Sequence, residues 1–322
     1  MLTHLRLTVP ADLTERVQQL LLDHECTTNV TLQTGVVLQP EGDLVECDVA
    51  REQAEQVLRA LDDLGLDERG GIVVESPTGT PFAAARRLEA AAPGHPDDAV
   101  IWESVESQAY AGAVPTVSFL LFLVFAVLLA AIAVITDSAI LVVGAMVVGP
   151  EFAAIAAISA GIVLLRWGLV WRSLRMLVLS FAFAVGVVTL IALFWKWIGW
   201  ITPELVTKAR PNTGFIWHPD KWSFIVALVA GAAGALALAI QKTATMVGVF
   251  ISVTTVPAAG NLALGLAVWE PSEIIGSLEQ LGANVAGMVI SGTLLLLVVR
   301  TSWPWITSST ERVLGYRPGG AR

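Results

Sequence analysis

The sequence predicts an α-helical polytopic membrane domain preceded by a small α+β domain. Its composition is 55% hydrophobic and 15% charged, with a mean hydropathy of +0.70, whereas about a quarter of the residues of soluble domains are charged. Apolar runs long enough to cross a bilayer as helices recur between residues 114 and 300. The charge is unevenly spread, because residues 1–99 carry 7 Lys+Arg against 18 Asp+Glu. Nucleic-acid binding needs a basic surface, so this acidic N-terminal region argues against it.

Residues 1–76 show the pattern of a ferredoxin-like domain. Some segments alternate between apolar and polar residues, as strands do, and two others carry an apolar stripe at helical spacing. Asp12 is expected to cap the first helix and Gly65 to end the second. The expected order is strand, helix, strand, strand, helix, strand, at residues 3–10, 12–25, 28–38, 43–49, 51–64 and 71–75. Domains with this split β-α-β order can bind small effectors or mediate dimers, and a plain structural cap is the alternative.

We expect this domain to stay in the cytoplasm, since the N-terminus has no continuous apolar segment of the signal-peptide type. Cys26 and Cys47 are then expected to be thiols. Together with His4 and His24 they could form a metal site, but their spacing matches no standard zinc pattern. Buried structural thiols are the better interpretation, and we expect no metal and no cofactor.

Residues 77–113 are predicted to be a linker followed by a connector helix. An alanine-rich helix is expected over residues 82–91, and an amphipathic helix over residues 97–111. The apolar side of the second helix is expected to lie along the membrane surface or against the helix bundle. A simple coupling strut is the alternative.

The membrane domain, residues 114–300, is predicted to contain four continuous spans and two proline-broken helices. Roughly 20 apolar residues suffice for a continuous span. The broken helices have Pro150 or Pro257 near their centres. The spans are Val114–Ile135, Leu174–Phe194, Phe224–Ile240 and Ile274–Val299, and the broken helices are Asp137–Leu165 and Ala244–Val268. Residues 301–322 are expected to form a cytoplasmic tail.

The two halves of the membrane domain align without gaps at an offset of 107 residues, which places Pro150 on Pro257. Each half then consists of a span, a broken helix and a span. Three crossings per half make the two repeats inverted, as in many secondary transporters. The loop with Arg166, Arg172 and Arg175 would face the cytoplasm with both termini. The loop over residues 195–222, on the opposite side, is an exception to this charge distribution because it also carries Lys and Arg. An alternative topology treats each broken helix as a re-entrant hairpin.

The run ILVVGAMVVGPEF, after a Thr-Asp pair and the segment DDAVIWESVE, resembles a known family. This is the prokaryotic domain-of-unknown-function family 389, the uncharacterised hydrophobic domain proteins, and the resemblance covers about residues 97–270. It implies an inner-membrane protein with several spans. It implies no established reaction.

The first broken helix contains the main candidate site. Non-helical backbone at membrane depth persists only where protein or water satisfies its polar groups. Glu151 follows the Gly149-Pro150 break directly, and an acid in that position is a candidate proton- or cation-coupling group, with a helix-capping glutamate at the membrane surface as the alternative. Asp137 is a second candidate acid, and a helix N-cap near the interface is its alternative.

The second broken helix would contribute polar groups to the same site. Thr254 and Thr255 precede Pro257, and Asn261 follows it. Their hydroxyl and amide groups could bind a cation or a small polar solute, or they could only satisfy the backbone at a kink. The segment from Gly231 to Gly234 is expected to pack helices together.

No nucleophile elbow, phosphate-binding loop or metalloprotease motif occurs in the sequence, so we do not expect an enzyme. The favoured function is a membrane transporter or channel-like protein for an ion or small polar solute, coupled to protons through Glu151. The alternative is a membrane-anchored sensor or scaffold whose soluble domain binds a small effector. The expected partners are the lipid bilayer, the solute and further copies of the chain in a homo-oligomer.

Overall fold

The computed structural model describes residues 2–92, 99–216, 221–241 and 255–314. The chain divides into two compact units, Met1–Ser104 with Thr301–Arg322, and Val105–Arg300. Each unit has buried apolar residues of its own. The first is mainly a small α+β domain, and the second is entirely helical in its regular structure among these residues.

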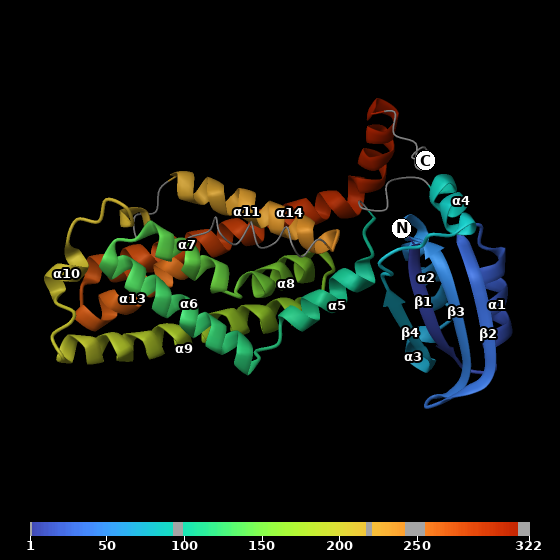
Figure 1. The fold of residues 1–322 in the computed structure, drawn as a ribbon, viewed down its shortest axis with the longest axis horizontal. Coiled ribbons are helices and arrows are strands. Elements are labelled where there is room, and N and C mark those ends of the chain that lie inside the picture. Colours follow the sequence, from blue (N-terminus) through green and yellow to red (C-terminus); the bar gives the residue numbers. More distant parts are fainter. Residues whose placement is uncertain (1, 93–98, 217–220, 242–254, 315–322) are drawn as a thin grey trace. The chain divides into compact units, whose positions relative to one another are not determined.

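The first unit contains a four-stranded antiparallel sheet (Figure 1). β1 lies between β3 and β4 and pairs antiparallel with both. One helix follows β1 and another follows β3, so the element order is the predicted order of a split β-α-β unit. The elements are β1 (Leu2–Val9), α1 (Thr14–Asp23), β2 (Thr27–Leu38), β3 (Glu41–Ala50), α2 (Ala54–Asp62) and β4 (Gly71–Glu75), with the sheet order β2-β3-β1-β4.

The core of this sheet domain is formed by one face of the sheet and the apolar stripes of α1 and α2. Alternate residues of β1 and β3 contribute to it, because successive side chains of a strand point to opposite faces. Cys47 is fully buried, and burial raises the pKa of its thiol to about 12, so it is a structural rather than a reactive thiol. The core includes Leu5, Leu7, Val45, Cys47, Val49, Val17, Leu21, Val57 and Leu61.

The prediction that Asp12 caps α1 is wrong. Leu13 occupies the N-cap position, and both carboxylate oxygens of Asp12 accept hydrogen bonds from Arg69 at 2.8 Å. Arg69 ends α3 (Leu66–Arg69), a short helix that the sequence did not predict. This helix follows Gly65, which ends the preceding helical segment with a φ of 72°, a conformation that favours glycine.

Two further helices follow the sheet domain, α4 (Ala83–Ala91) and α5 (Trp102–Gly112). The connector helix therefore begins later than predicted, and residues 93–98 lie outside the described part of the chain. Ile101 is buried in the core of the sheet domain, and the backbone N–H of Trp102 donates a hydrogen bond of 2.9 Å to Glu55 Oε2 on α2. These contacts fix the start of the connector to the sheet domain.

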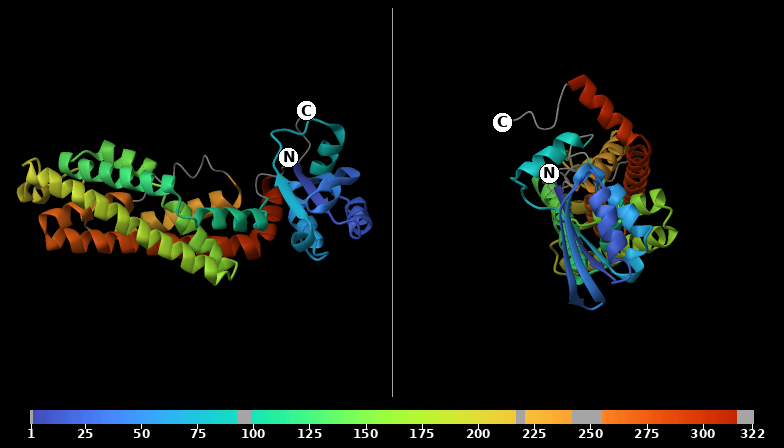
Figure 2. Two further views of the ribbon diagram at one scale, coloured as in Figure 1. Left: turned by 90° about the horizontal axis from the view of Figure 1, so that it is seen from below. Right: turned by 90° about the vertical axis from the view of Figure 1, so that its right-hand side faces the viewer.

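The second unit is a bundle of helices that run mostly along one axis (Figures 1 and 2). Four of its helices are long and apolar enough to cross a membrane, and the bent pair α7–α8 would make a fifth crossing, among the residues that the structure describes. These helices indicate a membrane protein. The elements are α6 (Val117–Thr136), α7 (Ala139–Val148), α8 (Phe152–Val163), α9 (Trp167–Trp197), α10 (Pro203–Thr207), η3 (Gly214–Ile216), α11 (Lys221–Ala239), α13 (Thr255–Val268) and α14 (Pro271–Leu314).

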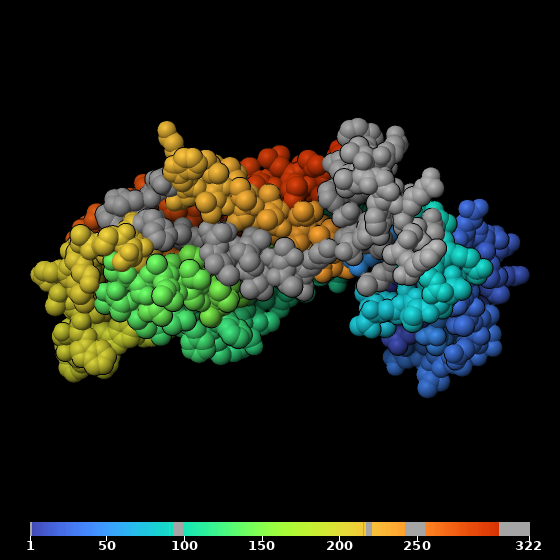
Figure 3. Space-filling view, turned by 45° about the horizontal axis from the view of Figure 1, so that its top comes forward, coloured from blue at the N-terminus to red at the C-terminus, as the bar shows by residue number. Residues whose placement is uncertain are grey.

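The two shorter helices α8 and α13 lie in the interior of the bundle. Ten of the twelve residues of α8 and twelve of the fourteen residues of α13 are buried. Large apolar side chains are exposed on the surrounding helices instead, for example Phe125 on α6, Val178 on α9 and Val229 on α11. Figure 3 shows one outer face of this unit, with α6 and α7 in green and α11 in orange. The interior helices are therefore enclosed by protein, and the outer ones present apolar surface.

Glycines allow the interior helices to approach closely. A Cβ atom on Gly234 of α11 would lie 2.0 Å from the Phe152 ring of α8, and one on Gly231 would lie 2.4 Å from the Met288 backbone oxygen of α14. The predicted packing role of the Gly231–Gly234 segment is thus confirmed. Neither position has room for a side chain unless a neighbour moves.

Candidate functional site

The break between α7 and α8 lies at Gly149-Pro150, as predicted. Gly149 is the C-cap of α7, Glu151 is the N-cap of α8, and the two helices meet at a bend of 54°. Proline has no backbone N–H, and its ring does not fit inside a continuing helix. A Cβ atom on Gly149 would lie 2.4 Å from Glu151 Oε2 and 2.7 Å from Val256 Cγ2. The Gly-Pro-Glu order therefore bends the helix and leaves room for the carboxyl group beside the break.

Glu151 is buried inside the bundle. Only 8% of its surface is exposed, and Oε2 has no hydrogen-bond partner among the described residues. A buried polar atom without a partner is rare, because it loses its hydrogen bonds to water without replacement. An enclosed acid at a broken helix is by default a functional-site candidate.

The α13 helix brings two further predicted residues into the interior. Thr255 and Asn261 are both fully buried, and the Thr255 hydroxyl has no hydrogen-bond partner within the described part of the chain. Pro257 lies near the start of the described part of α13, and residues 242–254 before it lie outside the described residues, so the break at Pro257 stays a prediction. Thr254 lies outside the described residues.

Asn261 belongs to a buried ion-pair network at one end of the bundle. The Arg210 guanidinium donates to Asn261 Oδ1 at 2.7 Å and to Glu273 Oε1 at 2.5 Å. The Asn261 amide donates in turn to Glu273 Oε2 at 2.7 Å and to Ser277 Oγ at 2.9 Å. The side chains of Arg210 and Glu273 are only 2% and 3% exposed. The network joins the loop after α10 to α13 and α14.

The polar residues of α14 continue from this network as one stripe. Glu273, Ser277, Gln280 and Asn284 are spaced by four, three and four residues, so they share one face of the helix. All four are at most 2% exposed, and the Gln280 amide donates to Asn284 Oδ1 at 3.2 Å. At a rise of 1.5 Å per residue, the stripe extends about 16 Å into the bundle.

Asp137 lies at the same end of the bundle as Arg210, far from the break. It is not a helix N-cap but the C-cap of α6, with a φ of 50°, and Ser138 caps α7 instead. Its carboxylate accepts hydrogen bonds from Thr213 Oγ1 at 2.8 Å and from the Asn212 backbone N–H at 3.2 Å. Asp137 therefore holds the loop that also carries Arg210.

The depth of the break follows from these contacts. The α7 helix has ten residues and begins beside Asp137, so Glu151 lies about 15 Å from that end of the bundle. Gln280 lies nine residues into α14, about 14 Å from the same end. The polar stripe of α14 therefore reaches the level of the buried acid.

Sequence reasoning missed Arg210, Glu273, Ser277 and Gln280. The spacing of the α14 stripe is visible in the sequence, where a polar residue recurs on one helical face of an apolar segment. Arg210 could not be found in this way, because only the path of the loop between α9 and α11 brings it to Glu273.

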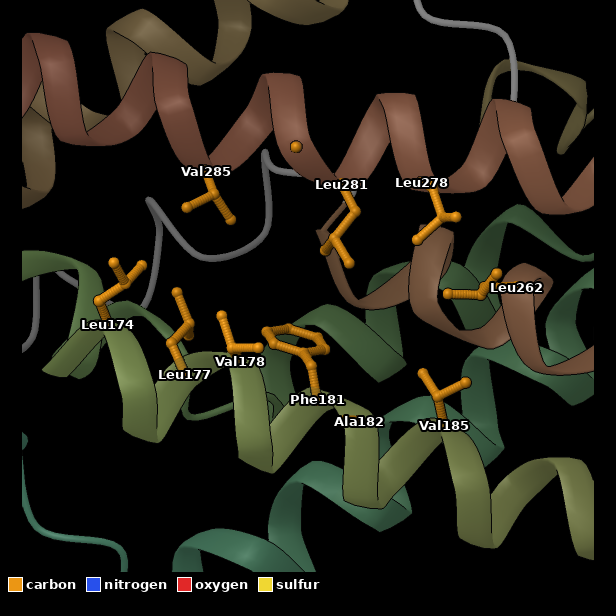
Figure 4. Close-up of a pocket in the computed structure, with 11 residues that line it drawn as sticks. Leu174, Leu177, Val178, Phe181, Ala182, Val185, Leu262, Leu278, Leu281 and Val285 are labelled. Carbon is orange, nitrogen blue, oxygen red and sulfur yellow. The ribbon is translucent and has the colours of Figure 1, made fainter. Parts of the chain in front are cut away.

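The surface of the bundle carries an apolar groove between α9 and α14, floored by α13 (Figure 4). Its volume is about 440 Å³, and its lining side chains, such as Phe181, Leu262 and Leu281, are all apolar. None of the buried polar residues above lines this groove. The groove and the polar interior are thus separate features.

The second unit is a helix bundle of the kind found in membrane proteins, with a polar interior. A membrane protein is also what the resemblance of the sequence to a known family implies. Residues 146–290 match the model of the family described as Domain of unknown function (DUF389). The match includes Glu151, Arg210, Asn261 and the α14 stripe, whereas Asp137 and the sheet domain lie outside it. No curated protein and no solved structure matches the chain.

Proposed function

We propose that the second unit is a membrane transporter or channel-like domain for an ion or a small polar solute, with Glu151 as its ionisable coupling group. The observation that carries this proposal is the buried polar stripe that leads from Glu273 to the depth of Glu151. Polar side chains inside a membrane bundle are costly, and they mark ion and solute pathways. The buried Arg210–Glu273 pair lies at the outer end of this stripe and would close it.

The arrangement of helices supports an internal duplication, which is the basis of many transporter folds. The long helices α9 and α14 begin 104 residues apart, at Trp167 and Pro271, and in each half a shorter helix before them, α8 or α13, is buried. With each central element as one crossing, three crossings per half would invert the second repeat.

The distribution of cations supports a cytoplasmic location for both termini. Arg166 precedes α9, and the Arg300 guanidinium hydrogen-bonds to the Val163 carbonyl, so these two arginines belong to one end of the bundle. Positive residues near short loops favour the cytoplasmic side of an inner membrane. Cations at the other end make specific structural contacts: Lys196 binds the Ala267 carbonyl and Lys208 the Ile135 carbonyl, both at helix ends. Fixed contacts of this kind explain why the opposite loop is also basic.

Flux measurements on the purified full chain in sealed liposomes test the proposal. A pH-sensitive dye inside the vesicles would report proton movement, driven in turn by gradients of monovalent cations, anions and amino acids. Glu151→Gln should abolish the pH-dependent flux, because the amide cannot carry a proton. Glu279→Gln is the matched control, since Glu279 lies on the exposed face of α14, and its flux should equal that of the wild type. Unchanged flux in Glu151→Gln would remove this residue from the mechanism.

A sensor is the second candidate function, and the link between the connector and the sheet domain favours it. Trp102 binds Glu55 on α2, and the same helix α5 continues into the second unit as far as Gly112. A ligand on the sheet domain could therefore act on the bundle through α5. Ligand binding to the sheet domain without flux under any gradient would favour the sensor.

A further inference from the structure

The start of α9 forms one wall of a second groove on the bundle, of about 730 Å³. Arg172 and Arg175 line it, one helical turn apart, and both are exposed. Apart from Ser180, apolar side chains line the rest of its length, among them Leu120 of α6 and Leu179 and Phe183 of α9. The groove thus has a cationic part and an apolar part.

Among the residues that the structure describes, no carboxylate lines this groove. The nearby Arg166 is paired with Glu106 at 3.0 Å and is not among the lining residues. The first turn of α6, whose N-cap is Thr116, lies beside the groove at Pro115 and adds the positive end of a helix dipole. The groove therefore suits a ligand with one anionic end and an apolar body.

The position of the two arginines along α9 agrees with a lipid ligand. The uncharged residues 176–195 follow them, and this stretch is about 30 Å long as a helix, the thickness of the hydrocarbon core. Trp167 and Trp171 are exposed before it, and Trp197 is exposed after it, as in the aromatic belts at membrane interfaces. Arg172 and Arg175 would then lie at the level of the lipid headgroups.

We propose that this groove binds an anionic phospholipid, whose phosphate pairs with Arg172 and Arg175 and whose acyl chain lies along Leu179 and Phe183. Two guanidinium groups on one helix face can each donate hydrogen bonds to phosphate oxygens. The inference depends on the membrane location in the proposed function, but it does not depend on transport.

Native mass spectrometry of the full chain in mild detergent tests the site, with dioleoylphosphatidylglycerol as the anionic lipid and dioleoylphosphatidylcholine as the zwitterionic one. The wild type should retain the anionic lipid preferentially. A cationic residue at an anionic surface contributes about fivefold in affinity, so Arg172→Gln with Arg175→Gln should weaken binding of the anionic lipid about thirtyfold. Arg166→Gln is the matched control and should bind as the wild type does.

Two further variants separate the contributions of charge and groove. Replacement of Arg172 and Arg175 with lysine should keep most of the preference, because the charge remains. Leu179→Trp should fill the apolar part and weaken lipid binding while both arginines remain. Equal affinity for the two lipids, or an unchanged preference in the double glutamine variant, would overturn the proposal.

Two controls identify the source of any phosphate binding and the role of the membrane. Glycerol phosphate, which has no acyl chain, should not compete with the lipid at equal concentration, and full competition would show a soluble-phosphate site instead. Release of the protein from cell membranes by alkaline carbonate would contradict the membrane location and the lipid site together. Loss of flux with an intact lipid preference would contradict transport alone.

Discussion

Removal of the Arg210 charge should destabilise the bundle strongly, because it leaves the Glu273 carboxylate buried without its cationic partner. The two side chains are 2% and 3% exposed and 2.5 Å apart. Removing one member of such a pair typically costs about 3–5 kcal/mol. In Arg210→Met this corresponds to a fall of the unfolding temperature on the order of 10 °C, which thermal unfolding of the detergent-solubilised protein would measure.

Two comparisons make this prediction specific. Arg210→Met with Glu273→Leu should recover most of the lost stability, because the double variant buries no unpaired charge. Arg166→Gln, which breaks a pair whose side chains are 57% and 28% exposed, should change stability by about 1 kcal/mol or less. A small loss in Arg210→Met, or a double variant as unstable as the sum of the single ones, would refute the role of the buried pair.

Two further predictions concern packing and pH. Gly231→Ala should destabilise the bundle by about 1–3 kcal/mol, because its Cβ would meet the α14 backbone. Gly282→Ala on the open side of α14 should be neutral or stabilising in the same unfolding assay. Equal effects of the two substitutions on stability would contradict the close packing at Gly231. Burial, reinforced by Glu89, raises the pKa of Glu52 from 4.5 to about 7. The stability that protonated Glu52 contributes should be complete below pH 4.5 and lost as the pH rises through 7. The protection of the α2 amides from hydrogen exchange, relative to the intrinsic exchange rate at each pH, should therefore fall over that range in the wild type and not in Glu52→Gln.

The sheet domain could be predicted from the sequence because its signals are local. The alternation of β1 and β3 and the stripes of α1 and α2 specify which faces are buried, and the β-α-β-β-α-β order restricts the topology. The missed details depend on contacts between distant residues. Asp12 has the sequence features of an N-cap residue, but in the structure its carboxylate pairs with Arg69, which lies 57 residues later in the chain.

The site in the bundle was predictable only where the backbone itself signals it. Gly149 and Pro150 mark a break in any apolar helix, so the position of Glu151 beside a bend followed from the sequence. The same proline signal at Pro257 stays a prediction, because residues 242–254 before α13 lie outside the described part of the chain. Arg210 was missed because a loop cation in a basic segment resembles an interfacial residue until its burial is known.

Reactivity of a single cysteine at position 280 tests most directly whether the polar interior opens to water. In a chain whose Cys26 and Cys47 are replaced with alanine, Gln280→Cys in sealed vesicles would be treated with a charged, membrane-impermeant thiosulfonate. We predict that it reacts, and that Leu278→Cys, which is exposed on the apolar groove, does not. No reaction of Gln280→Cys from either side, under conditions in which Ser272→Cys at the end of the bundle is modified, would contradict a solute pathway along α14.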